Sequence, residues 1–458
     1  MTAEHAVEAL GAPPIWTTLP FVGYLLLIAV APLAFPHFWE HNRNKLLLGL
    51  IASAPVVAYL LIGEPHGLEW LHHALREYVA FIALLASLFI ISGGVYLRGS
   101  LAGTPLVNTG VLSIGALLAS FIGTTGASML LIRPLLRANE KRERKVHIVV
   151  FFIFIVSNGA GMLTPLGDPP LFLGFLRGVP FLWTFQLVWP WALVNGALLV
   201  LFNIVDQRVL NREERERPGS QLEQVQQVKE PLAIDGGLNF LWLAGVIAVI
   251  YGIGRFGDQI THHEDLLSLL QVAGMLGMAA LSLATTMKAT RAANQFAWGP
   301  ILEVAALFLG IFLTMIPALK VLEAKGADLG VTQPWQYFWA TGLLSSFLDN
   351  APTYLTFASL AVGAVNDMDP QAALTADQLG GLVEHPDGAL FLIAISCGAV
   401  FMGANTYIGN GPNFMVKAIA EASGVRMPSF FRYMLWSGFI LLPLFLVVTL
   451  IFFRATVG

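Results

Sequence analysis

One stretch restricts the fold of this chain more than any other. It is a polar break, rich in glycine and proline, at residues 157–170 inside an otherwise apolar run, and the flanking segments 149–156 and 171–176 resemble two half-helices. In a membrane the freed backbone groups of such a break meet no water. Irregular backbone at that depth persists only where it is packed in protein or lines a site. The break therefore predicts a binding site.

The same pattern occurs a second time. Thr-Pro-Leu-Gly-Asp-Pro-Pro at 164–170 aligns with Thr-Tyr-Ile-Gly-Asn-Gly-Pro at 406–412, 242 residues later, inside a second apolar run at 389–420. Interrupted helices in corresponding positions of two halves are typical of secondary transporters.

The composition predicts a multi-pass membrane protein. The chain is 56% hydrophobic and 12% charged, its mean hydropathy is +0.71, and its apolar runs reach the roughly 20 residues that span a bilayer. This composition disfavours nucleic acid as a partner. The single cysteine, Cys397, excludes an intramolecular disulfide. The first 18 residues lack Lys and Arg, so we expect the first span to be retained and not cleaved as a signal peptide.

We expect an all-α fold of ten spans plus two re-entrant helical hairpins. The expected hairpins cover 106–136, interrupted at 123–126, and 336–362, interrupted at 349–352. Leu-Leu-Ala-Ser-Phe-Ile in the first matches Leu-Leu-Ser-Ser-Phe-Leu in the second. The expected spans, two of them broken, are 19–35, 45–62, 79–97, 149–176, 182–205, 237–256, 266–286, 300–319, 389–420 and 433–453.

The two halves read as an inverted repeat. The first covers 1–205 and the second covers 237–458, and the charged segment 206–236 between them reads as a solvated cytoplasmic linker. Basic residues gather on the cytoplasmic side of membrane proteins, and this layout places all but six of the 25 Lys and Arg there, with both termini external. The six on the outside are Arg76, Arg177, Arg255, Lys320, Lys325 and Arg454.

Two carboxylates are the strongest candidates for function. Asp168 ends the first break and Asp349 lies in the tip of the second hairpin. An ionised acid near mid-membrane costs at least a few kcal/mol and is functional by default. Binding either a proton or a metal ion offsets that cost. Glu303, near the start of its span, is a weaker candidate because it can face cytoplasmic water.

Polar side chains around both acids supply oxygen ligands suited to an alkali cation, although such residues can also merely cap broken helices. A membrane enzyme is the most distant alternative, because no catalytic motif is present. The run His-His-Glu-Asp at 262–265 resembles a metal cluster, but it fits a solvated turn better because no second ligand set accompanies it.

The paired motifs are similar to those of the ion transporter superfamily, which includes sodium-coupled carboxylate carriers, arsenite carriers and sodium/proton antiporters of the NhaD type. The resemblance covers nearly the whole chain. It implies a homodimer in which a moving part carries the hairpins and broken helices. It also implies two mirrored cation sites, the first formed by Thr124, Thr125, Ser128, Asn158, Thr164, Gly167 and Asp168 and the second by Asp349, Asn350, Thr353, Asn405, Thr406 and Asn410.

The hairpin tips depart from the carboxylate carriers, which show Ser-Asn-Thr there. Here the tips read Gly-Thr-Thr-Gly-Ala at 123–127 and Asp-Asn-Ala-Pro-Thr at 349–353, and these resemble the antiporters. We therefore expect a sodium (or lithium)/proton antiporter without a cofactor, working by alternating access in a bacterial inner membrane. A sodium-coupled citrate or dicarboxylate symporter that uses the same residues remains the alternative.

Overall fold

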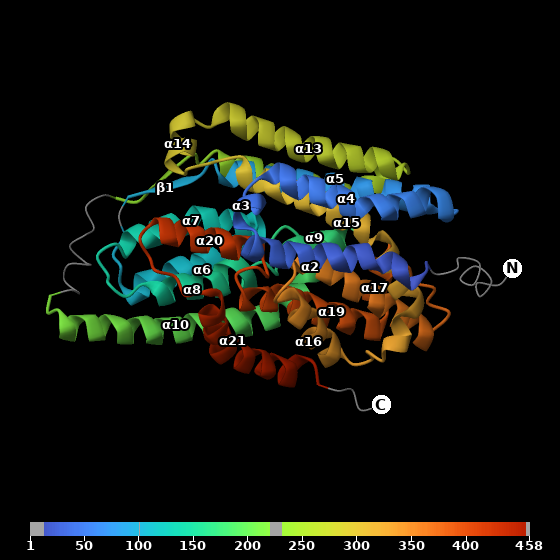
Figure 1. The fold of residues 1–458 in the computed structure, drawn as a ribbon. Coiled ribbons are helices and arrows are strands. Elements are labelled where there is room, and N and C mark those ends of the chain that lie inside the picture. The colour runs from blue at the N-terminus through green and yellow to red at the C-terminus, as the bar shows by residue number, and fades with distance from the viewer. Residues whose placement is uncertain (1–12, 100, 220–230, 455–458) are drawn as a thin grey trace.

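The computed structural model describes residues 13–99, 101–219 and 231–454, and nearly all of this chain is helical (Figure 1). Within those ranges, ten helices are long and apolar enough to cross a membrane. This confirms the prediction of an all-α, multi-pass membrane protein. A short antiparallel pair of strands, β1 (Tyr96–Arg98) and β2 (Ala233–Asp235), joins the two halves of the chain at one end.

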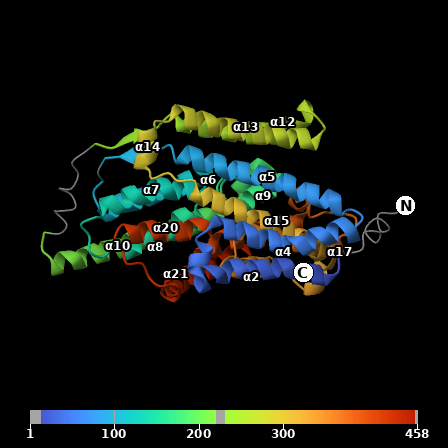
Figure 2. The same ribbon diagram turned by 45° about the horizontal axis from the view of Figure 1, so that its top comes forward.

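The helices form two packed groups (Figures 1 and 2). We call the first the long-helix layer, and α15 is its centre because α2, α4 and α5 all pack against it, while α13 packs against α5 and α12. Its members are α2 (Leu19–Ala34), α4 (Asn42–Gly63), α5 (Gly67–Ser92), α12 (Asn239–Ile260), α13 (Glu264–Thr285) and α15 (Gly299–Lys325).

The second group is the broken-helix layer, which contains all the interrupted segments. Its members are α6 (Pro105–Ile122), α7 (Thr124–Ala138), α8 (Val146–Phe154), α9 (Pro169–Leu176), α10 (Val188–Glu216), α16 (Pro334–Ser345), α17 (Asn350–Met368), α19 (Pro386–Met402), α20 (Gly411–Ala422) and α21 (Phe430–Phe452). Short connecting helices are α3 (Pro36–Trp39), α14 (Lys288–Ala293), α18 (Gly380–Glu384) and the 3-10 turns Ile15–Thr18, Phe181–Leu187, Gly326–Leu329 and Gly403–Asn405.

Glycine and proline determine where the interrupted helices stop and restart. Gly123 separates α6 from α7 with a φ of 79°, a conformation that glycine adopts without a steric penalty. Proline stands in the first turn of α6, α9, α16, α19 and α20, where its missing N–H costs no hydrogen bond. α8 ends in a π-helical turn, Ile155–Gly159. All four breaks occur near their predicted positions, but two are displaced: α7 begins at Thr124, inside the expected break 123–126, and α17 begins at Asn350, inside the expected break 349–352.

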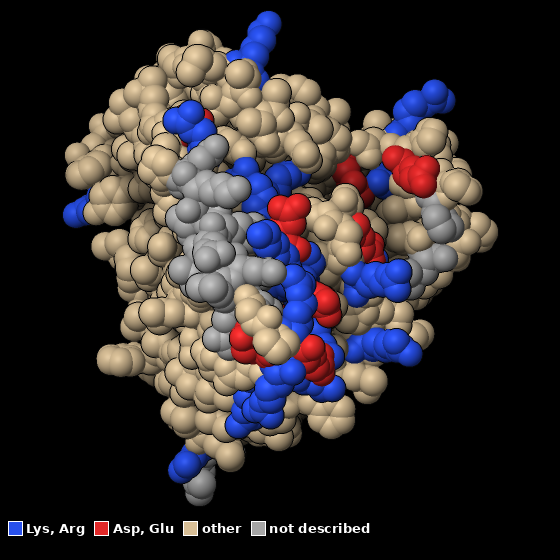
Figure 3. Space-filling view, turned by 90° about the vertical axis from the view of Figure 1, so that its left-hand side faces the viewer, with Lys and Arg blue, Asp and Glu red and all other residues tan. Residues whose placement is uncertain are grey.

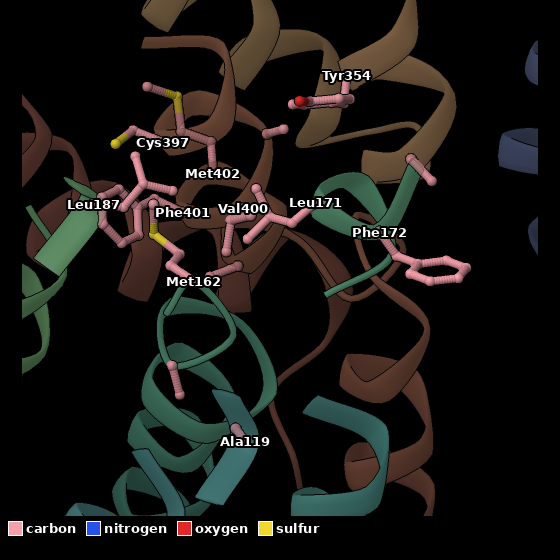
Figure 4. Packing of buried hydrophobic residues seen from close by; sticks show 14 of the residues in the cluster. Ala119, Met162, Leu171, Phe172, Leu187, Tyr354, Cys397, Val400, Phe401 and Met402 are labelled. Atoms are coloured by element: carbon pink, nitrogen blue, oxygen red, sulfur yellow. The ribbon is translucent and has the colours of Figure 1, made fainter. Parts of the chain in front are cut away.

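The two halves of the chain pack into one core within the broken-helix layer. Helix α7 from the first half contacts α20 from the second, and α17 from the second half contacts α9 from the first. Met162 in the first break belongs to the same buried cluster as Val400 and Phe401 of α19 (Figure 4). Cys397 is buried in this core. The interrupted segments are therefore held between elements of both halves.

The set of ten long apolar helices differs in one member from the ten spans expected from sequence. It includes α6 in place of the first broken helix, whose apolar part, Val146–Gly159, is too short, and its segment Pro386–Asn405 is the first arm of the expected broken span 389–420. In the sequence layout, α6 was one arm of a hairpin. The two sets thus reach the same number with different segments.

Two boundaries expected from sequence are wrong. Helix α5 begins at Gly67, twelve residues before the expected start of the third span at 79, and ends at Ser92. Helix α10 continues to Glu216, so the solvated linker does not begin at Asp206. Asp206 is instead buried, pairing with Arg142 at 2.5 Å and His147 at 2.8 Å. A charge-rich composition predicts a solvated segment, but it does not show that a single residue such as Asp206 pairs with other charges in the interior. Residues 220–230 of that linker lie outside the described part.

Basic residues are concentrated at one end of the molecule. Figure 3 looks onto the left-hand end of Figure 1, where α10 ends and where α14 and β1 lie, and shows Lys and Arg gathered there with a smaller number of acidic residues. We call this the basic end.

Candidate functional site

Asp168 is the centre of the candidate site. Its side chain is 1% exposed and lies where the first break ends and α9 begins. Three neutral side chains donate to its carboxylate: Thr124 Oγ1 at 3.2 Å, Asn350 Nδ2 at 2.6 Å and Asn410 Nδ2 at 3.5 Å. Thr124 and Asn350 are the first residues of α7 and α17, and Asn410 occupies the position of Asp168 in the second break. Both halves of the chain thus meet at one carboxylate.

Four helices begin at this cluster. Thr124 starts α7, Asp168 precedes α9, Asn350 starts α17 and Asn410 precedes α20. The N-terminus of a helix carries a partial positive charge, so all four favour negative charge at the centre. Among the described residues, no Lys or Arg forms an ion pair with Asp168. Neutral donors and helix ends therefore replace a basic partner.

A row of asparagines connects the centre to both breaks. Asn158 donates to Asn413 Oδ1 at 2.7 Å and to the Ile153 carbonyl at 2.8 Å. Asn410 donates to Asn158 Oδ1 at 3.2 Å, and Asn413 donates to the carbonyls of Gly403 and Thr406, each at 2.9 Å. These bonds hold the two breaks against each other.

Hydroxyl groups connect the first break to the end of α6. Ser120 Oγ donates to the Ala160 carbonyl at 2.5 Å, and Thr164 Oγ1 donates to the Ser120 carbonyl. Thr164 Oγ1 also accepts from Leu166 N at 3.2 Å. Each hydroxyl thus satisfies a backbone group that the broken helix leaves free.

The second break repeats these bonds at equivalent positions. Ser346 Oγ donates to the Met402 carbonyl at 3.2 Å, and Thr406 Oγ1 donates to the Ser346 carbonyl at 2.5 Å and accepts from Ile408 N at 3.2 Å. Gly403 and Gly409 approach each other as closely as Gly161 and Gly167 do, so that a Cβ on Gly409 or Gly167 would meet the partner carbonyl at 2.5 or 2.4 Å. The two breaks therefore share one backbone arrangement.

Asp349 differs from Asp168 in exposure and in partners. It is partly exposed and caps α17 by accepting from Ala351 N at 3.0 Å. It directly precedes Asn350, but within the described chain no side-chain bond joins the carboxylates of Asp349 and Asp168. Its neighbour Asn350, not Asp349, makes the contact with the central carboxylate.

Three buried amide oxygens in or beside this region have no hydrogen-bond partner: Asn195 Oδ1, Asn350 Oδ1 and Asn405 Oδ1. Asn350 is fully buried and Asn405 is 8% exposed. A buried polar atom without a partner carries an energetic cost and calls for an explanation such as a bound ion or water. Oxygen atoms of this type, together with a carboxylate and hydroxyl groups, are ligands that hard cations prefer.

The comparison with known families fits this arrangement. A family model described as "Putative citrate transport" matches residues 11–453. The chain belongs to this family. The citrate transport family is part of the ion transporter superfamily and is a transport family, not an enzyme family, so the resemblance seen in the sequence is confirmed at the level of the superfamily. No curated protein matches the chain.

For this member of the citrate transport family, the structure gathers only some of the expected ligands around Asp168. Thr124, Asn158, Asn350 and Asn410 lie in or next to the central cluster. Gly167 supports the backbone of the first break, since its carbonyl accepts from Thr124 N at 2.9 Å. The expected division into two mirrored sets is not seen at the centre, because Asn350 and Asn410 of the second set contact Asp168 of the first.

The remaining expected ligands lie farther out. Thr164 and Thr406 maintain the breaks, and Asn405 donates to Ser346 Oγ at 2.9 Å. Thr353 donates to the Asp349 carbonyl at 2.9 Å, and Ser128 bonds Ser157 at 2.9 Å. These contacts give each residue a structural role beside any role in binding.

A cavity of about 70 Å³ lies beside the centre, between the two layers. Thr124, Thr125, Gly126 and Gly167 line it on the broken-helix side. On the long-helix side its walls are apolar, formed by Leu85, Leu88 and Phe89 of α5 and Pro300, Ile301 and Val304 of α15. Space of this size holds several water molecules. The sequence predicts Thr125 as a site residue. It does not predict the apolar wall, because α5 and α15 are distant from Thr125 in sequence and meet it only in the folded protein.

One residue outside the break motifs also supports the site. Asn195 of α10 donates to the Gly159 carbonyl at 2.9 Å and so supports the first break from behind. An asparagine in a long apolar span is the signal that could have found it. The histidine turn is exposed, and its Glu264 and Asp265 pair with Arg76 at 2.9 and 3.3 Å. In the described part, no cluster of three or more His, Cys, Asp and Glu is positioned to hold a metal.

Proposed function

We propose that this protein is a secondary active transporter that exchanges sodium or lithium for protons by alternating access. The observation that carries the proposal is Asp168: one buried carboxylate, three neutral donors, unpartnered amide oxygens nearby and no basic partner in the described chain. A buried acid without a cationic partner is costly when ionised. A proton or an alkali cation lowers that cost, and each excludes the other from the same oxygens.

The proposed arrangement is an inverted repeat with two re-entrant hairpins. It is supported by the equivalent hydrogen bonds of the two breaks and by the reciprocal packing of α7 on α20 and α17 on α9. In this arrangement α6 and α7 form one hairpin and α16 and α17 the other. The basic end faces the cytoplasm, both termini are external, and the protein works as a homodimer in a bacterial inner membrane.

The second candidate is a sodium-coupled citrate or dicarboxylate symporter. Two observations favour it: the description of the matching family and the four helix N-termini that converge on the centre, since such ends attract anions. Against it stands the position of Asp168, which already occupies the focus of those ends. A substrate carboxylate would need a bound cation between itself and Asp168.

Reconstitution in liposomes distinguishes the two candidates. A pH-sensitive dye trapped inside reports proton movement after sodium, lithium, potassium or citrate is added outside. Exchange predicts a pH change with sodium or lithium alone, and an equal response to sodium with and without citrate. A response that needs citrate, together with uptake of labelled citrate, would replace antiport by symport.

A further inference from the structure

A buried ion pair crosses between the two layers far from Asp168. Glu77 of α5 receives two bonds from Arg177, which caps the end of α9: Nε to Oε1 and Nη2 to Oε2, each at 2.8 Å. The two side chains are 4% and 3% exposed. A bidentate pair of this kind fixes both distance and orientation. It therefore joins the long-helix layer to the broken-helix layer at a defined position.

A second pair reinforces the first. Lys320 of α15 bonds Asp377 at 2.6 Å, and Asp377 lies in the segment between α17 and α18. Arg177 Nη1 also donates to the Ala376 carbonyl at 3.0 Å. Burial by itself raises the pKa of Asp377, but Lys320 and Arg177 outweigh that effect and hold the pKa below its ordinary value. The carboxylate thus stays ionised and paired.

His73 and Glu323 complete the surroundings of these pairs. His73 lies 3.3 Å from Glu77 and 4.0 Å from Asp377, and Glu323 lies 3.2 Å from Lys320. The cluster therefore contains four residues of the long-helix layer and two of the broken-helix layer, with both signs of charge on each side. Pairs made across the interface hold the layers together only in one relative position.

A cavity lies at the opposite end of the same interface. Glu77 and Phe89 are twelve residues apart on α5, about 18 Å along a helix, and Lys320 and Val304 are sixteen residues apart on α15, about 24 Å. At the Phe89 and Val304 end lies the cavity that reaches Thr124 and Gly167. This end of α15 follows α14 and belongs to the basic end.

We propose that the Glu77–Arg177 and Lys320–Asp377 pairs are an outer lock, which closes the interface on the external side while Asp168 is reached from the basic, cytoplasmic end. The inference rests on the proposed function for its sidedness and for the alternation between two states. Movement of the broken-helix layer toward the outside breaks both pairs. Loss of the lock lowers the energy needed for that movement and shifts the population outward.

Two reporter cysteines in a Cys397→Ser background test the lock without reference to any transported ion. Val304→Cys lies in the cavity wall and is partly exposed, whereas Ala376→Cys is buried beside Arg177. With an impermeant maleimide we expect Val304→Cys to be labelled from the cytoplasmic side and Ala376→Cys to be protected. Adding Glu77→Gln should lower the rate at which Val304→Cys is labelled from the cytoplasmic side. It should also raise the rate at which Ala376→Cys is labelled from the external side by at least about tenfold.

The matched control is Asp206→Asn, which breaks another fully buried pair, with Arg142, inside the broken-helix layer. It should lower stability without changing the labelling pattern. Should Glu77→Gln not fold, the exchange Glu77→Arg with Arg177→Glu, which keeps one charge of each sign, and Asp377→Asn, at a more exposed site, carry the test. The exchange should restore the parent pattern and Asp377→Asn should shift it partly outward.

Unchanged labelling in folded Asp377→Asn, or equal shifts in Glu77→Gln and Asp206→Asn, would overturn the lock. Labelling of Val304→Cys from the external side would overturn it too, because the cavity would then face outward. A failure of the proposed exchange itself is seen separately, as sodium binding that does not depend on pH. Labelling shifts in the absence of sodium would still support the lock in that case.

Discussion

The two breaks of the broken-helix layer are alike in backbone and unlike in charge. Thr164 and Thr406 make equivalent bonds to the carbonyls of Ser120 and Ser346, and the glycine pairs close each break in the same way. Yet the first break ends in Asp168 and the second in Asn410. At the starts of α7 and α17 the difference is reversed, since Gly123 aligns in sequence with Asp349. We call the equivalent hydroxyl bonds and glycine pairs the shared frame of the two breaks. Each carboxylate, in contrast, belongs to one half only.

This difference teaches that equivalent positions need not make equivalent sites. Asn410 donates to Asp168, so the amide of one half serves the carboxylate of the other. A second acid at 410 would face Asp168 with two charges in one buried space, where like charges strongly disfavour double ionisation. A single central acid avoids that conflict. The comparison leads to four predictions.

The largest effect is expected from Asp168→Asn. The amide keeps the shape of the side chain but can release no proton and offers no charge, so sodium-driven proton movement should be abolished. In the parent protein the apparent sodium affinity should weaken as pH falls, by up to about tenfold per pH unit once protons fill the site. In Asp168→Asn that dependence should disappear. Sodium titration calorimetry at several pH values measures both.

The control for this variant moves the carboxylate to the other half. In Asp168→Asn with Asn410→Asp the acid would face the Ser157 carbonyl, which now accepts from Asn410 at 3.1 Å. Two acceptors repel, so transport should remain at background. Full activity in the double variant would mean that the two halves are interchangeable. It would contradict the prediction that the central acid works only at position 168.

A smaller effect is expected from Asp349→Asn. This acid is partly exposed and bonds only a backbone N–H among its described contacts, which an amide oxygen can also accept. The fold should therefore survive. Transport should fall at least about tenfold, because loss of the charge removes a few kcal/mol of attraction for a cation near Asp168. Flux assays on reconstituted protein measure the loss, and wild-type rates would remove Asp349 from the mechanism.

Asn350→Ala and Asn405→Ala compare two of the unpartnered amide oxygens. Asn350 also donates to Asp168, so its removal should weaken sodium binding about tenfold or more, whereas Asn405 lacks that contact and should give a several-fold loss. Sodium-dependent changes in thermal stability report both affinities. Equal sodium stabilisation of both variants and the parent would show that neither oxygen is a ligand.

Much of the layer that carries the breaks was predictable because glycine and proline restrict the backbone locally. The breaks at 123–126 and 157–170 follow from such residues, and the alignment of 164–170 with 406–412 reveals the shared frame. The convergence of Thr124, Asn350 and Asn410 on Asp168 was not predictable. It depends on how distant segments pack, and equivalent motifs suggested two separate mirrored sites.

Charged residues were misread for a related reason. Asp206 looks like part of a solvated linker because charges surround it in sequence, but it pairs with Arg142 and His147 in the interior. Glu77 and Arg177 are 100 residues apart, and nothing local marks them as partners. Local composition reports average polarity, whereas a buried ion pair depends on a single tertiary contact.

The smallest effect should come from removing the shared frame itself. Thr164→Val and Thr406→Val keep the side-chain shape but leave the carbonyl of Ser120 or Ser346, and the N–H of Leu166 or Ile408, without the hydroxyl partner. Each loss should destabilise the fold by about 1–3 kcal/mol.

Thr406→Val should cost slightly more, because its hydroxyl also accepts from Gly409 N at 3.1 Å. Thermal unfolding in detergent measures the pair, and sodium flux in liposomes should change little in either. If the breaks share one frame, the two variants should lose stability in parallel and keep the pH dependence of sodium binding. A Thr164→Val variant that loses pH dependence while Thr406→Val retains it would place Thr164 among the ligands of Asp168's cation, and the frame would then differ in function between the halves.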